Sequence, residues 1–203
     1  AFYAVLMGWT LTTLVHALMD GLPKNEAEAT AFYDGLSGGR SALLGQGISL
    51  LLTAVVVAAG VKGGIERLSR WGLPLLFAML IGLVIWSGNL PDALSGYNTF
   101  LLRWDASYLV DLTTIRHAFE QAFFSIGTGI GCILCYSAYL DRKARLPKEA
   151  VAIVGMDTAV GLLAGMVTFP IVMSFDLSDL VGSRPLGAIF IALPTGLSSL
   201  QGT

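Results

Sequence analysis

Ser125 and Asp157 are polar residues that lie deep inside long apolar stretches, where side chains able to do chemistry are rare. Ser125 opens the run Ser-Ile-Gly-Thr-Gly-Ile-Gly, which holds three glycines and ends at Gly131. A glycine inside a helix destabilises it by about 1 kcal/mol relative to alanine. Such glycines are typical either of close packing between membrane helices or of an unwound segment, whose free carbonyl groups and half-helix ends can bind an ion or a carboxylate.

The positions of these two residues predict that they reach the same depth in a membrane. Ser125 lies nine residues after Arg116, and Asp157 lies nine residues after Lys148. At 1.5 Å per residue, each is about 13 Å from a charged end, close to the middle of a hydrocarbon core. A carboxylate at this depth is a functional-site hypothesis by default, although a structurally paired or protonated carboxyl is the alternative. With Gln121 on the helix face of Ser125, the oxygen atoms suit a hard cation such as sodium, or a proton relay.

The composition is typical of a chain embedded in lipid. Hydrophobic residues make up 55% of the sequence and charged residues 13%, against about 25% charged in soluble domains. The net charge is −2, with no basic stripe, so we expect no nucleic-acid partner.

The other reactive side chains indicate neither a zinc site nor an enzyme. Cys132 and Cys135 lack two further ligands at suitable spacing, and we expect two small buried residues. His117, Glu120 and Ser125 supply the residue types of a hydrolase. Because no G-x-S-x-G turn accompanies them, we expect no enzymatic activity.

Five stretches are apolar enough to be transmembrane helices of about 20 residues. Their predicted bounds are about 1–19, 41–61, 70–90, 112–140 (broken near 125–131) and 149–175.

The connections between these stretches alternate in charge, which predicts the orientation of the chain. Residues 62–70 and 141–149 hold seven of the twelve Lys and Arg residues, and both are predicted to be cytoplasmic loops. Residues 21–40 and 91–111 are more acidic and are predicted to be surface loops on the outer side.

The last part of the chain is predicted to lie on the outer face without crossing the membrane. Pro170 is expected to kink the fifth span or end its regular part. The apolar stretch 186–193, which ends at Pro194, is too short to span, so 176–203 is predicted to be an extracellular re-entrant lid. Since the chain starts at Ala1 without a methionine and stops after an apolar stretch, we expect it to be an internal piece of a larger protein.

A series of short motifs runs through the whole chain. In order, they are Phe2-Tyr3 with Trp9-Thr10, Lys62-Gly63-Gly64-Ile65-Glu66-Arg67-Leu68-Ser69, Pro74-Leu75-Leu76-Phe77, Gln121-Ala122-Phe123-Phe124-Ser125 with Gly129 and Gly131, Tyr136-Ser137-Ala138-Tyr139-Leu140, Asp157, Ala164-Gly165, Phe169-Pro170 and Ile189-Phe190-Ile191-Ala192-Leu193-Pro194. They resemble the third to seventh transmembrane helices and the outer lid of the neurotransmitter:sodium symporter family, with one extra glycine in the second motif.

The resemblance implies an all-α polytopic membrane protein, of which the chain is an internal fragment: a LeuT-like transporter with inverted repeats and a discontinuous helix. It implies sodium-coupled symport of an amino acid or related amine across the plasma (cell inner) membrane, with substrate and sodium bound near 125–131. Membrane lipid and a small-molecule substrate are the implied partners, and a homodimer of the full-length protein is left open.

The resemblance also assigns roles by position. Tyr3 would meet the substrate carboxylate, and Phe124 would cover the substrate while its backbone carbonyl faces the amine. Gly127 and Ile130 would line the side-chain pocket, with Gly127 standing where many bacterial members carry serine. Ser125 would lie at the substrate and be a sodium ligand.

Asp157 aligns with an asparagine that many members use at the same sodium site. Chloride-dependent members balance the sodium charge with an anion near Gln121 and Ser125. Because Gly161 offers no hydroxyl there, we expect Asp157 to supply the fixed negative charge, so that chloride is not required.

Two other functions stay open at this point. The chain could belong to a membrane sensor that keeps the fold without transporting. It could also belong to a proton-coupled amino-acid carrier in which Asp157 titrates.

Overall fold

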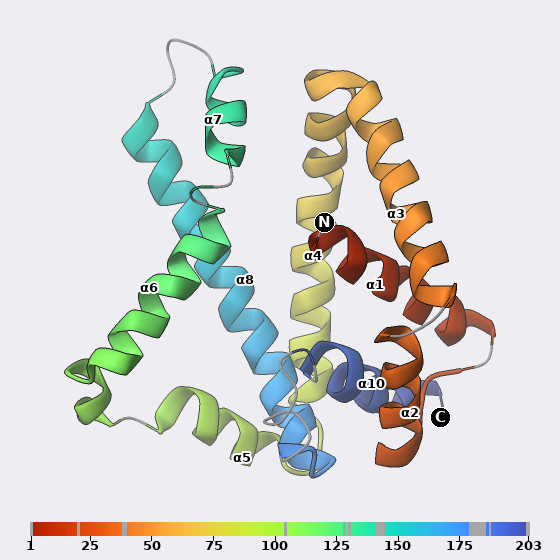
Figure 1. Cartoon of the computed structure of the whole chain (residues 1–203). Coiled ribbons are helices and arrows are strands. Elements are labelled where there is room, and N and C mark those ends of the chain that lie inside the picture. Colours follow the sequence, from red (N-terminus) through yellow and green to blue (C-terminus); the bar gives the residue numbers. More distant parts are fainter. Residues whose placement is uncertain are drawn as a thin grey trace.

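The structure is a computed structural model that describes residues 2–19, 21–37, 40–103, 105–127, 129, 131–140, 145–178, 186 and 188–201. In this part of the chain all regular secondary structure is helical (Figure 1), which confirms the predicted all-α class. The elements are α1 (Phe2–Met19), α2 (Glu26–Ser37), α3 (Arg40–Ala58), η1 (Val61–Ile65), α4 (Glu66–Ser87), α5 (Ala93–Tyr97), η2 (Asn98–Leu102), η3 (Ala106–Leu109), α6 (Leu112–Ile126), α7 (Cys132–Ser137), α8 (Leu146–Ser174), η4 (Ala188–Ala192) and α10 (Leu193–Gln201).

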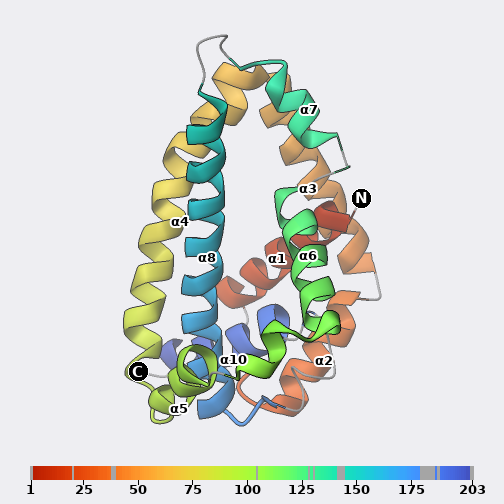
Figure 2. The ribbon, with the colours of Figure 1, turned by 90° about the vertical axis from the view of Figure 1, so that its left-hand side faces the viewer.

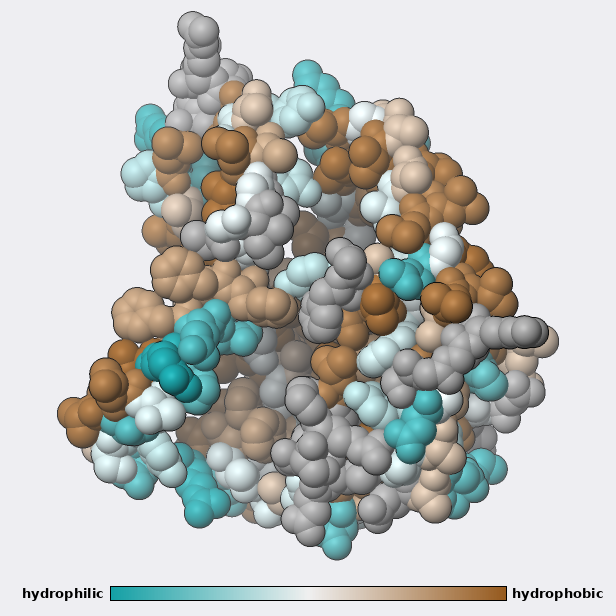
Figure 3. Space-filling model, in the orientation of Figure 1, coloured by the Kyte–Doolittle hydropathy of each residue, from teal (hydrophilic) through white to brown (hydrophobic). Residues whose placement is uncertain are grey.

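The long helices present apolar side chains outward. Val61–Ser87 and Leu146–Ser174 are long and apolar enough to cross a membrane, and Tyr3–Met19 and Ala42–Ala58 are apolar but shorter. The chain exposes 14089 Å², whereas a compact soluble protein of 21.5 kDa would expose about 9,200 Å². Apolar side chains gather over α3 in Figure 3. This surface suits a chain whose helices face lipid or further helices.

Helices α1 and α3 cross closely at two glycines. A Cβ atom on Gly8 would lie 2.6 Å from the backbone nitrogen of Gln46, and one on Gly45 would lie 2.6 Å from the carbonyl oxygen of Gly8. Neither position tolerates a side chain without moving backbone. Small residues let the two helices approach in the manner common in membranes.

Two segments predicted to be loops contain helices instead. Within 21–40, α2 follows a capping box: Asn25 Oδ1 accepts from the Glu28 N–H at 2.9 Å, and Asn25 Nδ2 donates to Glu28 Oε1 at 2.9 Å. Within 91–111, α5, η2 and η3 form. The loop predictions were wrong because they rested on charge and glycine content and overlooked local capping and helix-forming alanines.

The segment 62–70 is also helical rather than a loop. The chain leaves α3 through Gly60, which has φ 78°, and η1 is a π-helical turn that continues into α4. Gly64 is buried, and a Cβ atom there would collide with the carbonyl oxygen of Val56. A π turn holds more residues than an α turn, so it accommodates the glycine by which this segment exceeds the family motif. Its cytoplasmic location stays a prediction, as does that of 141–149, of which 141–144 lie outside the described residues.

Helix α8 continues past Pro170 to Ser174, so the helix does not end at the proline, and the alternative of a kink there stays a prediction. Proline has no N–H, which leaves the carbonyl of Met166 without its helical donor. The hydroxyl of Ser87, at the end of α4, lies 3.3 Å from that carbonyl and 3.2 Å from the carbonyl of Val84, so its one proton is shared between two acceptors. From the other side, Gly96 of α5 lies so close that a Cβ atom would be 2.5 Å from the Pro170 nitrogen. We call Ser87, Gly96, Met166 and Pro170 the α4–α5–α8 corner.

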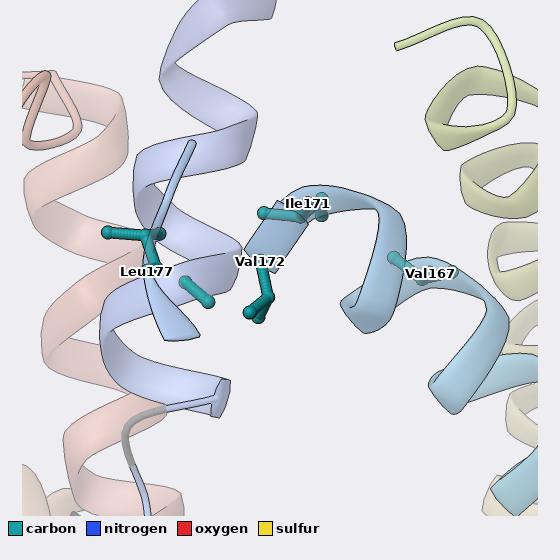
Figure 4. Close-up of a cluster of buried hydrophobic side chains, with 5 residues drawn as sticks. Val167, Ile171, Val172 and Leu177 are labelled. Atoms are coloured by element: carbon teal, nitrogen blue, oxygen red, sulfur yellow. The ribbon is translucent and has the colours of Figure 1, made fainter. Parts of the chain in front are cut away.

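The buried core lies where α8 ends. Val167, Ile171, Val172, Leu177 and Ala192 form an apolar cluster, shown in Figure 4. Figure 1 shows α8 meeting α4 at this end and diverging from it toward the N-terminal end of α8, and Figure 2 gives the view at 90°. The core and the corner therefore fix one end of α8 and leave its other end to reach away from them.

The described part of the predicted lid is helical from Ala188 to Gln201, with Pro194 in the first turn of α10. Phe190 is buried, and its ring centroid lies 5.4 Å from that of Trp9 in α1. This segment packs against α1 and α8 and forms no hairpin between residues 188 and 201. Its extracellular position stays a prediction.

Candidate functional site

Helix α6 begins and ends at identifiable residues. Asp111 caps its N-terminus, because its Oδ2 accepts from the backbone N–H of Thr114 at 2.9 Å and from the Thr114 hydroxyl at 2.8 Å. These bonds, led by the hydroxyl, hold the pKa of Asp111 below its usual range. At the other end Gly127 takes the left-handed conformation, with φ 69°, and its N–H donates to the Phe124 carbonyl at 3.2 Å.

The helix is broken over the predicted segment. Gly127, Gly129 and Gly131 have φ values of 69°, 84° and 83°, a region that residues with a Cβ atom rarely adopt. The chain resumes as α7 at Cys132. A Cβ atom on any of the three glycines would meet nothing within 4 Å. The glycines therefore permit an unwound backbone, and the predicted discontinuous helix is confirmed.

Ser125 and Asp157 meet across two helices. Ser125 Oγ, on the last turn of α6, lies 2.8 Å from both Oδ1 and Oδ2 of Asp157 on α8. The hydroxyl has one proton to share between the two carboxylate oxygens. The three oxygen atoms lie close enough to be ligands of one hard cation, for which oxygen is the preferred donor.

Two aromatic residues assigned to the substrate also come together. The ring centroids of Tyr3 on α1 and Phe124 on α6 lie 5.9 Å apart, and both side chains are about half exposed. Phe124 directly precedes Ser125, so α1, α6 and α8 converge on one place. Tyr3 and Phe124 are 121 positions apart in the sequence, and Ser125 and Asp157 are 32 apart.

The remaining predicted site residues are placed as follows. Gln121 is exposed one turn before Ser125 on α6, and Gly127 starts the unwound segment. Ile130 lies outside the described residues. The roles of these residues as ligands, pocket lining or charge balance stay predictions.

His117 and Glu120 form a separate polar cluster on α6. His117 Nδ1 lies 3.1 Å from Glu120 Oε2, and Arg116 Nε lies 3.4 Å from Glu120 Oε1. His117 precedes Ser125 by two helical turns, a rise of about 12 Å, so these residues do not form a hydrolytic triad with Ser125. No group of three or more His, Cys, Asp and Glu side chains is close enough to hold a metal ion in the part of the chain that the structure describes.

A cavity that the sequence did not predict lies beside the other end of the unwound segment. It has a volume of about 730 Å³ and is lined by Gly131, α7 and the turn between α3 and α4, including Lys62, Cys135, Tyr136 and Tyr139. Cys135 is exposed there, so the expectation of two buried cysteines was wrong for this residue. The side chain of Cys132 lies outside the described part of the chain.

An all-helical apolar chain with a helix unwound beside a hydroxyl and a carboxylate has the features of a polytopic membrane transporter built from broken helices. The comparisons specify the family. The profile of the Sodium:neurotransmitter symporter family matches residues 41–201, and the chain belongs to this family of transporters.

Relatives support this assignment over almost the whole chain. An uncharacterized sodium-dependent transporter, YhdH, of Bacillus subtilis (strain 168) is 35% identical over 97% of this chain and 44% of its own length. A sodium-dependent transporter of Haemophilus influenzae is 31% identical over 98% of this chain and 44% of its own length. The crystal structure of MhsT in complex with L-phenylalanine matches with a TM-score of 0.84 and 36% identity, over 98% of this chain and 44% of that one. The chain thus spans less than half the length of these proteins.

Proposed function

We propose that this chain forms part of a sodium-coupled symporter that carries an amino acid or related amine across the plasma membrane. The observation that carries the proposal is the meeting of the Ser125 hydroxyl with both carboxylate oxygens of Asp157, at 2.8 Å, beside the unwound segment 127–131. The names of the sodium-dependent relatives support sodium as the coupled ion.

Sodium would bind between the two helices as a co-transported substrate. Ser125 Oγ and the Asp157 carboxylate offer oxygen atoms only, which suits a hard cation such as sodium. The carboxylate carries the negative charge that balances the ion. Transport would accordingly need no chloride, and Gln121 would contribute an amide beside the ion and no charge.

The organic substrate would lie between α1 and the end of α6. Carbonyl groups at the C-terminal end of a half-helix carry partial negative charge and suit an amine, and Phe124 supplies one of them. The Tyr3 hydroxyl would meet the carboxylate, and the two rings would cover the substrate. L-phenylalanine bound to MhsT supports an amino acid as the cargo class.

Sodium-dependent thermal stabilisation tests the ion site. At a sodium concentration ten times the Kd, binding should stabilise the folded protein by about 1.4 kcal/mol, and potassium should not. Asp157→Ala should abolish this shift. Glu149→Ala, which removes an exposed carboxylate from the first turn of the same helix, should leave it intact. An equal shift with potassium, or a full sodium shift in Asp157→Ala, would contradict the proposed site.

Uptake into proteoliposomes tests transport, with the protein as its gene encodes it. A sodium gradient should drive uptake of labelled amino acids in the absence of chloride. Uptake that follows a pH gradient without sodium would instead support a proton-coupled carrier in which Asp157 titrates. Sodium-dependent stabilisation without any uptake would support the membrane sensor.

A further inference from the structure

A second hollow runs between α3 and α4. It has a volume of about 530 Å³. Its walls are aliphatic, from Val55 and Val56 on α3 and from Leu68 and Leu75 on α4, with Arg67 and Trp71 beside them. Two glycines leave room for it, because Gly63 in η1 and Gly72 in α4 have no neighbouring atom within 4 Å of a Cβ position. We call this hollow the α3–α4 groove.

The α3–α4 groove carries one positive charge that has no acidic partner within ion-pair distance among the described residues. Three basic residues lie near this end of α4. Arg70 pairs with Glu66 at 2.7 Å, and Lys62 lines the cavity beside α7. Arg67 lines the groove itself, next to the aliphatic side chains. A permanent cation at the edge of an apolar groove is suited to bind an anion that is attached to an apolar chain.

Trp71 adds a second indication of the same kind of ligand. Its side chain is 75% exposed and lies one turn along α4 from Arg67. Tryptophan and arginine gather at the level of lipid headgroups, where an amphipathic ring and a charge are both stable. Basic pockets between membrane helices bind anionic lipid headgroups.

We propose that the α3–α4 groove binds an anionic phospholipid. The phosphate group pairs with Arg67, Trp71 lies at the boundary between headgroup and hydrocarbon, and one acyl chain follows Val56, Leu68 and Leu75 toward the middle of the membrane. The groove lies outside the predicted transport site, so this binding is additional to the proposed symport. It would favour membranes rich in anionic lipid.

Quenching of Trp71 by brominated lipids tests the proposal. The protein, as its gene encodes it, is reconstituted into two sets of phosphatidylcholine vesicles with the same minor fraction of phosphatidylglycerol. In one set the phosphatidylglycerol carries bromine on its acyl chains, and in the other an equal fraction of the phosphatidylcholine does. Subtracting the Trp71→Phe signal isolates Trp71 from the other tryptophans, since the sequence holds four. Brominated phosphatidylglycerol should quench Trp71 more strongly.

Matched variants distinguish a specific lipid site from a general attraction between positive charge and anionic lipid. Arg67→Gln should lower the preference for phosphatidylglycerol about fivefold, the effect of one basic residue near an anionic surface. Arg70→Gln, which removes the same charge outside the groove, should keep the preference. Gly72→Leu adds a side chain at the groove whose Cβ atom would have no protein atom within 4 Å. It should lower quenching, whereas Gly82→Leu on the same helix should not.

Three results would overturn the proposal. Equal quenching by the two brominated lipids would show no selectivity for the anionic headgroup. Equal losses in Arg67→Gln and Arg70→Gln would show a diffuse charge effect. Quenching by neither lipid would show that protein, and not lipid, covers the groove. None of these results bears on sodium-dependent stabilisation, which tests the transport site separately.

Discussion

Helix α8 accepts a hydrogen bond from a serine hydroxyl at two places. The two places differ in the burial of the serine and in the charge of the acceptor. At the α4–α5–α8 corner, Ser87 is fully buried and donates to a neutral carbonyl that a proline has freed. At the broken helix, Ser125 is exposed and donates to the carboxylate of Asp157. The first hydrogen bond satisfies a backbone carbonyl that has no helical donor. The second joins a hydroxyl and a carboxylate, to which other ligands could bind instead.

The glycines around the two places differ in the same way. Gly96 lies against the backbone of Pro170, where a Cβ atom would be 2.5 Å from the proline nitrogen. Gly127 and its two companions have open space around them and positive φ values. Helix α8 is therefore packed tightly around Pro170, which we call its clamped end. Near its other end it has the contact between Asp157 and Ser125, which we call the lightly touched end. The clamped end sets where the Asp157 carboxylate lies, and the lightly touched end leaves Ser125 free to exchange partners.

Gly96→Val should have the largest effect, because it forces a side chain into the clamped end. Overpacking of this kind costs up to about 3 kcal/mol, and here the obstructing atoms are backbone. We expect a fall in Tm of the purified protein in detergent, measured by circular dichroism. Gly161→Ala is the matched control, since it lies on α8 with nothing within 4 Å of its Cβ position. Equal Tm losses in the two variants would contradict the close packing.

Ser87→Ala should have the next largest effect, because it leaves the partly buried Met166 carbonyl without a donor. An unsatisfied buried acceptor costs about 1–3 kcal/mol. Pro170→Ala restores a backbone N–H at the position that would donate to the same carbonyl, so Ser87→Ala should cost less in that background. A double-mutant cycle measures the coupling, expected at about 1 kcal/mol. Additive losses would show that Ser87 does not replace the missing proline donor.

Gly129→Ala tests the lightly touched end, where conformation and not packing requires glycine. A residue with a Cβ atom in the left-handed region costs about 1–2 kcal/mol. The variant should therefore lower Tm modestly and weaken the sodium-dependent shift, since the unwound segment borders Ser125. Gly155→Ala on α8, also with open space at its Cβ position, should leave the sodium shift unchanged and should not lower Tm, because alanine is favourable inside a helix. An unchanged sodium shift in Gly129→Ala would separate the unwound backbone from the ion site.

The sequence was sufficient to predict the lightly touched end and insufficient to predict the clamped one. Apolar lengths and a rise of 1.5 Å per residue placed Ser125 and Asp157 at one depth, and the structure joins them. The clamp depends on Ser87 and Met166, which are 79 positions apart and chemically ordinary. No local pattern distinguishes Gly96, which is needed for packing, from Gly129, which is needed for its positive φ. Only the neighbours in space separate the two roles.

The missed helices have a different cause. Asn25 and Glu28 spell a capping box, a local signal that could have predicted α2 within the acidic segment 21–40. Charge and glycine content were given more weight than capping. The π turn at η1 had a sequence signal as well, which is the extra glycine within 62–64. This glycine could be interpreted only once Gly64 was seen to be buried against Val56.

The smallest expected effect concerns the N-terminal cap of α6. This helix positions Ser125 for its contact with Asp157. Hydrogen bonds from Thr114 lower the pKa of Asp111 in the folded protein, so its carboxylate form stabilises the fold above its unfolded pKa of about 3.9. This contribution is lost as the pH falls through the lower folded value. Asp111→Ala should therefore speed hydrogen exchange in the first turn of α6 at neutral pH. Asp111→Asn, which can also cap a helix, should exchange nearly as slowly as the parent and show no loss of protection between neutral pH and pH about 3. If protection in the parent protein were equally independent of pH, Asp111 would not stabilise the N-terminus of α6. The position of Ser125 would then depend on its contact with Asp157 alone.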